Sequence, residues 1–360
     1  MPTSTPFDVT KFINASQVGG IDAYVIDEGE GRGVRALCVN TGGGLRYRVL
    51  VDRGLDIDQA FFNYLSLTML SHKGVTPPTR ALDRGQDWLK GFPVGLLTSC
   101  GPTNIGGPCI DNGEELGLHG PHSNTAATIE SVIQPDPHAG RLEMSIVGRV
   151  RCGSFYGPNI ELRRTIASTL GSNVIRITDE FYNAGNTDTP HDWLLHINFG
   201  YPLVDGGAEI CCDEKKIEPM AGHAGSARRF REGVDYKRIP NPLASHAGTS
   251  SAVGYLYPRA GRDGMATVAI VNPRLGLGVA ITYNTRQFPR CGNWQHFGRG
   301  EYVTALEPMT ATVAGRDKDR AAGRMGMLKA GQRKRYQYVI EAVTDPRRLA
   351  ELRALNGRRG

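Results

Sequence analysis

Residues 193–202 read Trp193-Leu194-Leu195-His196-Ile197-Asn198-Phe199-Gly200-Tyr201-Pro202, an apolar run with one ionisable side chain. With the two-residue period of a β-strand, His196 and Asn198 share one face of this run, and only apolar side chains lie on the other. A histidine that is buried without a hydrogen-bond partner lowers the stability of a protein. The run therefore predicts a buried strand in which His196 is either a core residue satisfied by Asn198 or a functional group.

Two further runs have the same design. Leu116-Gly117-Leu118-His119-Gly120-Pro121 sets His119 beside a glycine, where a ligand or another backbone can approach closely. Tyr302-Val303-Thr304-Ala305-Leu306-Glu307-Pro308 sets Glu307 before a proline, where a strand ends or bulges. Taken singly, His119 fits a hydrogen-bonded turn, and Glu307 fits an ion pair with an arginine such as Arg316. If the three groups meet on one face of a sheet, they suffice for acid/base chemistry, because an apolar setting raises the pKa of a carboxylate.

Short apolar runs that alternate with turns predict an all-β chain. The 46 glycines and 21 prolines separate runs rich in Val, Ile, Thr and Tyr, which suit strands. Helical spacing is clear only at the end of the chain, where Pro346 begins a short helix that Asn356-Gly357 ends. Long loops, which are often functional, are expected at 61–91 and 214–254. We predict one large antiparallel β architecture with strands that include residues 34–40, 47–51, 142–150, 173–181, 266–271, 278–283 and 335–343.

Length and composition fit a single globular domain over residues 1–360, with 40% hydrophobic and 22% charged residues. The net charge is +6, but no basic cluster contains the interspersed aromatic residues that are typical of nucleic-acid binding. We therefore expect no nucleic-acid partner. No apolar run reaches membrane-spanning length and no secretory signal is evident, so we expect a cytoplasmic protein without a membrane partner. The seven cysteines form no CxxC pair, which argues against a disulfide framework or a zinc ribbon. Dinucleotide, P-loop, nucleophile-elbow and HExxH motifs are absent from the sequence.

Several other side chains suit the recognition of a polyol. Arg53 and Asp56 follow an apolar strand and could bracket neighbouring hydroxyl groups, or pair with each other in a turn. Trp294 and His296 combine an aromatic platform with polar tips, which favours stacking on a sugar, although a core tryptophan fits the same pattern. Three more candidates for substrate binding are Asn198, His122 and Asp205.

The order of these motifs resembles the aldose 1-epimerase (galactose mutarotase-like) superfamily and, within it, the DUF4432 branch. The resemblance implies a large antiparallel β-supersandwich with a carbohydrate cleft on one concave face. By motif position, Glu307 matches the general base, His196 the general acid, and His119 the histidine that binds substrate near the ring oxygen. The His-Ser-Tyr-Phe-Asn signature of true mutarotases is here His196-Ile197-Asn198-Phe199-Gly200, which leaves the substrate open. Five segments carry the closer resemblance: Asp52-Arg53-Gly54-Leu55-Asp56-Ile57, Leu97-Thr98-Ser99-Cys100-Gly101, Gly117-Leu118-His119-Gly120, His196-Ile197-Asn198-Phe199-Gly200-Tyr201-Pro202 and Leu306-Glu307-Pro308.

This resemblance implies an isomerase of carbohydrate metabolism that interconverts sugar anomers and needs no metal or cofactor. Glu307 would take the proton of the anomeric hydroxyl while protonated His196 donates to the ring oxygen, so that the ring opens, rotates and closes again. Their mutual attraction would favour an ionised Glu307 and a protonated His196. Two alternatives stay open: a metal-dependent sugar isomerase or lyase, with His119, His122, His196 and Glu307 as ligands, and a non-catalytic carbohydrate-binding protein. The expected partner is a small-molecule carbohydrate; its identity and any homo-oligomer stay open.

Overall fold

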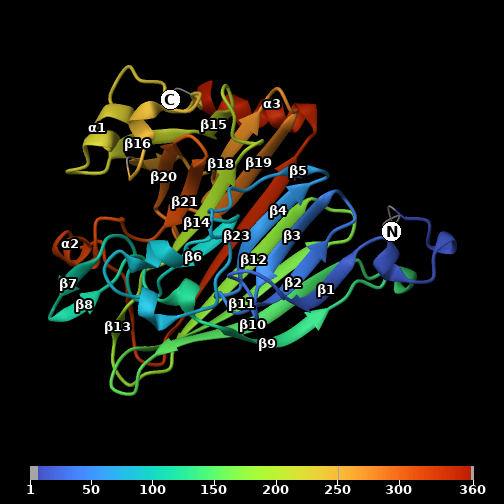
Figure 1. Ribbon diagram of the computed structural model, residues 1–360, viewed down its shortest axis with the longest axis horizontal. Coiled ribbons are helices and arrows are strands. Elements are labelled where there is room, and N and C mark those ends of the chain that lie inside the picture. The colour runs from blue at the N-terminus through green and yellow to red at the C-terminus, as the bar shows by residue number, and fades with distance from the viewer. Residues whose placement is uncertain (1–6, 250, 358–360) are drawn as a thin grey trace.

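The computed structural model describes residues 7–249 and 251–357, which form a sandwich of two antiparallel β-sheets (Figure 1). The larger sheet has eleven strands, in the order β1 (Gly20–Val25), β2 (Arg35–Asn40), β3 (Leu45–Leu50), β4 (Asp56–Phe62), β6 (Leu97–Cys100), β14 (Leu194–Gly200), β21 (Tyr302–Met309), β20 (Arg290–Phe297), β17 (Ala252–Pro258) and β16 (Glu214–Pro219), with β5 (Leu65–Ser66) paired to β4. The smaller has eight, in the order β15 (Glu209–Cys212), β18 (Met265–Asn272), β19 (Leu277–Asn284), β23 (Arg333–Val343), β12 (Val174–Asn183), β11 (Asn159–Thr169), β10 (Glu143–Gly153) and β9 (Ala127–Ile133).

Short elements decorate the two sheets. Two-stranded ribbons are formed by β7 (Cys109–Asp111) with β8 (Glu114–Leu116) and by β13 (Thr189–Pro190) with β22 (Met327–Leu328). The α-helices of the described residues are α1 (Ala224–Arg229), α2 (Arg316–Ala321) and α3 (Pro346–Ala354). Figure 1 shows α1 and β16 at one end of the molecule and β9 towards the other. The 3-10 helices are η1 (Val9–Lys11), η2 (Ala15–Gln17), η3 (Arg80–Leu82), η4 (Asp87–Gly91), η5 (His122–Asn124), η6 (Pro137–Ala139), η7 (Ala244–His246) and η8 (Leu355–Gly357).

The predicted alternation of β14 decides which face of the larger sheet holds the core. Leu195, Ile197 and Phe199 are fully buried in the cluster that fills the space between the two sheets. Leu194, on the opposite face, belongs to a second apolar cluster with Trp88 and other residues. Both faces of β14 are therefore covered, and the second face is the one that carries His196.

The predicted antiparallel sandwich with a short C-terminal helix is confirmed, and each predicted strand lies within or overlaps an observed one. In α3 the side chain of Asp345 caps the first turn by accepting a hydrogen bond of 2.8 Å from the backbone of Arg348. The segment 61–91 is a loop with only short elements. None of the helices in the described ranges is long and apolar enough to cross a membrane.

The prediction of a loop over 214–254 is wrong in part, because this segment contains β16, α1 and the start of β17. Strand β16 reads Glu-Lys-Lys-Ile-Glu-Pro and lies at the edge of the larger sheet. Natural proteins place charged residues and proline on edge strands, where they discourage pairing with another chain. The same residues hide the alternation by which a strand is recognised in a sequence.

Candidate active site

His196 and Glu307 lie side by side because β14 and β21 are neighbours in the larger sheet. The antiparallel register pairs Ile197 with Leu306, which sets the two polar side chains on the same face. His196 Nε2 and Glu307 Oε1 are 3.2 Å apart, and both residues are buried. Oε1 has no hydrogen-bond partner within the described part of the chain, so the contact is close but not aligned as a hydrogen bond. The structure thus brings together the acid and the base that the sequence suggests.

Gly292 leaves the space that the carboxylate of Glu307 occupies. It pairs with Glu307 from β20, on the side away from β14. A Cβ at position 292 would lie 2.5 Å from Glu307 Oε2 and equally close to Met309 Cε. Sequence analysis missed this residue, although a glycine inside a strand is the signal of such a close approach.

Asn198 fixes the tautomer of His196. Its Nδ2 group donates to the backbone oxygens of Val94, at 3.0 Å, and His196, at 2.9 Å. The amide oxygen therefore faces His196 Nδ1, 2.5 Å away, and only a donor at Nδ1 suits it. In the neutral ring Nε2, the atom that faces Glu307, then carries the lone pair.

His119 completes the group from a loop outside the sheet. Its φ of 61° is a conformation that few residues other than glycine adopt. Nδ1 accepts a hydrogen bond of 3.2 Å from the backbone of Gly106, so the neutral ring carries its proton on Nε2. The rings of His119 and His196 meet edge to face with centroids 5.8 Å apart. Burial lowers the pKa of His119 to about 3, which keeps it a neutral hydrogen-bond donor.

Burial places a single mobile proton on the His196–Glu307 pair. It raises the pKa of Glu307 to about 8 and lowers the pKa of His196 to about 4. Near pH 7 the proton is therefore on the carboxyl group, and both side chains are neutral. This corrects the expectation of an ionised Glu307 beside a protonated His196, since desolvation of two charges opposes their attraction. The ion pair and the neutral pair hold the same number of protons and differ only in which side chain carries the shared one.

Aromatic rings surround the pair. Phe92 and Trp294 contact the His196 ring edge to face, with centroid distances of 5.2 and 5.5 Å. Trp88 packs against Phe92 and against the ring of His119. Trp294 stacks nearly parallel on His296, so these two predicted residues do adjoin the site. Nothing in the sequence near Trp88 or Phe92 marked them, because the loop over 61–91, which Phe92 directly follows, brings them to the site from a distance.

Arg53 holds in place the loop that carries Trp88 and does not face a ligand. Its guanidinium is buried and donates to the backbone oxygens of Ser123, Thr76 and Gly91, at 2.5, 2.9 and 2.9 Å. These bonds tie the loop over 61–91 to the segment after His119. This placement contradicts the prediction that Arg53 binds a polyol.

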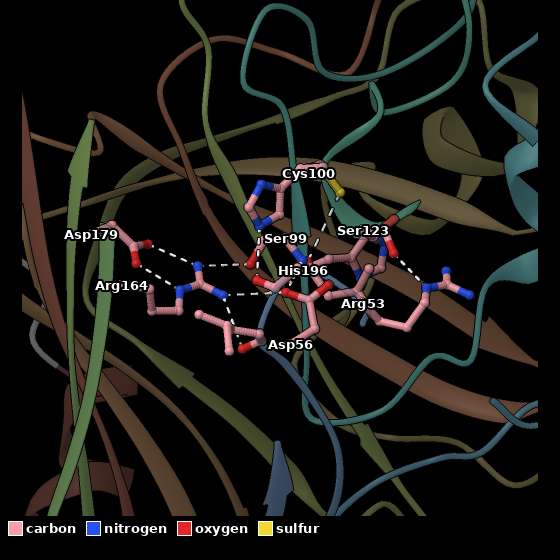
Figure 2. A network of polar contacts seen from close by, with 12 residues as sticks. Arg53, Asp56, Ser99, Cys100, Ser123, Arg164, Asp179 and His196 are labelled. Carbon is pink, nitrogen blue, oxygen red and sulfur yellow. Dashed lines mark hydrogen bonds and ion pairs between the residues drawn. The ribbon is translucent and has the colours of Figure 1, made fainter. Parts of the chain in front are cut away.

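Asp56 is buried and belongs to the network of polar contacts around Arg164 that Figure 2 shows. It accepts from the backbone of Ser99 at 3.0 Å and lies 3.3 Å from Arg164, a fully buried cation on β11. Arg164 also binds Asp179 through two hydrogen bonds, of 2.7 and 2.9 Å. Asp56 is thus part of an ion network that joins the two sheets. Its contacts with Arg164 and Ser99 favour neither of the two alternatives from the sequence, a polyol contact or an ion pair with Arg53.

The remaining predicted residues lie outside the group. His122 is fully buried, 3.0 Å from the backbone oxygen of Gly54 and against the Trp193 ring. It therefore does not lie beside His196 and Glu307, contrary to the expectation that it binds substrate there. Asp205 forms an ion pair with exposed Arg274. The arginine suggested as a partner of Glu307, Arg316, binds Asp111 and Glu114 instead.

A metal ion bound here would have to use the same atoms that the predicted acid/base mechanism needs for proton transfer and hydrogen bonding. The free imidazole atoms are Nε2 of His119 and of His196, beside Glu307 Oε1. In the described ranges, no three His, Cys, Asp or Glu side chains are grouped closely enough to hold a metal ion.

Replacing Gly292 with alanine is expected to lower catalytic turnover about 10²-fold, because the new methyl group displaces the Glu307 carboxylate from His196. Folding should change little, since the two crowded atoms are the ends of flexible side chains. The measurements are the turnover rate and the thermal midpoint. Gly107→Ala is the control, because its Cβ would meet only backbone oxygens at 3.8 Å. Equal activity in the two variants would contradict this role of Gly292.

Solved structures share this fold. A candidate aldose 1-epimerase from Klebsiella pneumoniae subsp. pneumoniae is similar with a TM-score of 0.85 and 23% identity, over 97% of this chain and 91% of that one. A galactose mutarotase-like protein from Clostridium acetobutylicum gives 0.63 and 11%, over 90% and 98%. A galactose 1-epimerase from Lactobacillus acidophilus gives 0.55 and 10%, over 90% and 98%. At these identities the likeness shows the fold, which is galactose mutarotase-like.

Comparison with curated proteins found no match. A family model, described as a domain of unknown function, matches residues 31–342. That range contains β2 to β22, most of β23, and His119, His196 and Glu307. The chain belongs to the DUF4432 family.

Proposed function

We propose that the protein is an aldose 1-epimerase-like enzyme that interconverts the anomers of a sugar by opening and closing its ring. The observation that carries this proposal is the buried His196–Glu307 contact of 3.2 Å, with the neutral donor His119 beside it. A hemiacetal carbon bears two oxygens, the ring oxygen and the hydroxyl oxygen. Two adjacent groups that share one proton can act on both oxygens at once.

In the first step Glu307, ionised, takes the proton of the anomeric hydroxyl, and His196 donates from Nε2 to the ring oxygen. The bond from the anomeric carbon to the ring oxygen breaks while the carbonyl forms. The pair then holds its proton on Glu307, which is the form that burial favours. Rotation about the bond from C1 to C2 and the reverse transfers close the ring as the other anomer.

Two further contacts would hold the sugar during these steps. His119 Nε2 would donate to the ring oxygen or to a neighbouring hydroxyl group, because Gly106 fixes the tautomer that has a proton there. Trp294 and Phe92, both partly exposed, offer ring faces to the apolar side of a sugar.

The deciding experiment is anomer exchange measured by saturation-transfer NMR on a panel of aldoses and sugar acids, with and without EDTA. Exchange above the solution rate that is unchanged by EDTA is the expected result. Activity that EDTA removes would support a metal-dependent isomerase or lyase instead. Sugar binding without exchange would support a non-catalytic carbohydrate-binding protein.

The rate should depend on pH as a bell, because the reaction needs one proton on the pair. Below about pH 4 His196 and Glu307 both hold a proton, and above about pH 8 neither does. We expect kcat/KM, corrected for the solution reaction, to fall on both sides of this range. A profile that stays level from pH 7 to about pH 10 would contradict the shared proton.

A further inference from the structure

A cavity of about 550 Å³ beside α1 has a lining that carries positive charge and donors. Its residues come from α1 and the residue before it, from the segment that follows α1, and from η7 and the residues on either side of η7. Among the described residues, no aspartate or glutamate contributes to this lining. Six residues supply its main polar groups: His223, Arg228, Arg229, Arg231, Ser245 and His246.

The arginines of this cavity form no ion pair with a carboxylate in the described part of the chain. Arg229 is partly buried and donates to Gln295 Oε1 at 2.6 Å and to the backbone oxygens of Asp235, Tyr236 and Arg238. Its position is thus fixed by neutral oxygens. Over residues 7–249 and 251–357 the exposed side chains of Arg228 and Arg231 form neither hydrogen bonds nor ion pairs. Three positive charges therefore meet at one cavity, and the carboxylate that acts on them, Asp235 beside Arg229, does not line it.

Both histidines of the cavity present a donor. His223 Nδ1 accepts from the backbone of Ser226 at 3.1 Å, and His246 Nδ1 accepts from the backbone of Phe297 at 3.0 Å. Each neutral ring consequently carries its proton on Nε2. Two N–H donors and the guanidinium groups of Arg228 and Arg231 suit a carboxylate or a phosphate, which offers only acceptors, and Arg229 adds a positive charge beside them.

A row of rings joins this cavity to the acid/base pair. His246 stacks on His296 with centroids 6.1 Å apart, and His296 stacks on Trp294 at 6.2 Å. Trp294 in turn contacts the ring of His196 at 5.5 Å. Trp294 and His296 alternate with residues on the other face of β20, so they share the face that carries Glu307. The cavity and the pair therefore lie on the same face of the sheet, separated by three ring-to-ring steps.

We infer that the cavity binds an anionic group, a carboxylate or a phosphate, carried by the carbohydrate whose reducing end lies at His196 and Glu307. The separation requires a substrate longer than one sugar ring, so the substrate class is an acidic disaccharide or a longer acidic saccharide. This inference rests on the proposed function.

The first arm of the test uses inorganic phosphate as a probe and does not depend on activity. Its dissociation constant is measured by calorimetry at low ionic strength, where exposed charges are least screened. Replacing Arg228 and Arg231 together with alanine should weaken binding about ten-fold or more. The control is Arg32→Ala with Arg347→Ala, which removes the same charge from exposed positions outside the cavity. Equal affinity in the two double variants, or no binding by the native protein, would overturn the site.

The second arm distinguishes a sugar-borne anion from a free one. The KM of a disaccharide acid should rise about ten-fold in the Arg228→Ala, Arg231→Ala variant, with kcat kept and the neutral parent disaccharide unaffected. Phosphate should inhibit turnover of the acid only. If both sugars respond alike, the substrate inference is overturned and the cavity binds a free anion. If no sugar is turned over but phosphate binding depends on the arginines, the proposed function fails while the anion site stands.

Discussion

Replacing Glu307 with glutamine is expected to lower the rate of anomer exchange by roughly 10²–10⁴-fold, because the amide cannot take up the proton of the anomeric hydroxyl. Sugar binding should persist, since glutamine has nearly the shape of the carboxylic acid. The fold should persist as well. Burial already keeps Glu307 protonated near pH 7, so the substitution removes no charge from the folded state. The amide group also fits beside the lone pair on His196 Nε2 without adding a charge.

Exchange rates from saturation-transfer NMR and sugar affinities from calorimetry measure the two effects separately. Glu143→Gln is the control, because it makes the same change at an exposed position on β10, in the other sheet. Full activity in Glu307→Gln would remove Glu307 from the mechanism. Loss of binding in parallel with activity would show that the carboxylate holds the sugar instead of moving a proton.

The grouping of His196 with Asn198 followed from the sequence because it depends on one strand. A period of two residues sets the face of each side chain, and β14 keeps that period without a bulge. That Glu307 stands beside His196 depends on β21 being the neighbour of β14, across more than 100 residues of chain. No local pattern encodes that pairing, and only the resemblance of the motif order to a known family indicated it.

Arg53 and Asp56 show why a local pattern can mislead. Both are polar residues that follow an apolar strand, and a polar side chain at such a position can bind either a ligand or another residue of the protein. The internal partners come from distant segments: Thr76, Gly91 and Ser123 for Arg53, and Arg164, 108 residues away, for Asp56. A buried charge is tolerable only where such partners are supplied, and the sequence does not show which segments will supply them.

Arg164 is the central member of the network between the sheets, and its replacement by leucine is expected to lower the free energy of unfolding by about 3–5 kcal/mol. The substitution leaves Asp179 and Asp56 in the core without a cation. Asp179 keeps only neutral donors, such as the indole Nε1 of Trp193 at 3.0 Å. Asp56 keeps the backbone of Ser99, beside the residue that pairs with His196. The substitution should therefore disturb the candidate active site as well as lower the free energy of unfolding.

The loss should depend on pH in a definite direction. Burial raises the pKa of Asp56 to about 7 although Arg164 lowers it, so removal of Arg164 raises it further. A carboxyl group whose pKa is higher in the folded state than in the unfolded state binds its proton more tightly when folded. Its unfavourable contribution is then absent below the unfolded pKa, grows as pH rises from the unfolded to the folded pKa, and is constant above the folded pKa. The variant should consequently lose less stability at about pH 5 than at about pH 8.

Urea unfolding of paired variants separates this network from an ordinary ion pair. Arg149 pairs with Glu130 and Glu161 on the outside of the smaller sheet, so Arg149→Leu should cost no more than about 1 kcal/mol. Adding Asp179→Asn to Arg164→Leu should restore part of the loss, because it removes one unpaired charge and keeps an acceptor for Trp193. Equal costs for the two arginines would mean that the core tolerates the bare carboxylates. In that case the backbone pairing of β6 with β14 and the apolar packing around it would suffice, and the candidate active site should survive the loss of Arg164 intact.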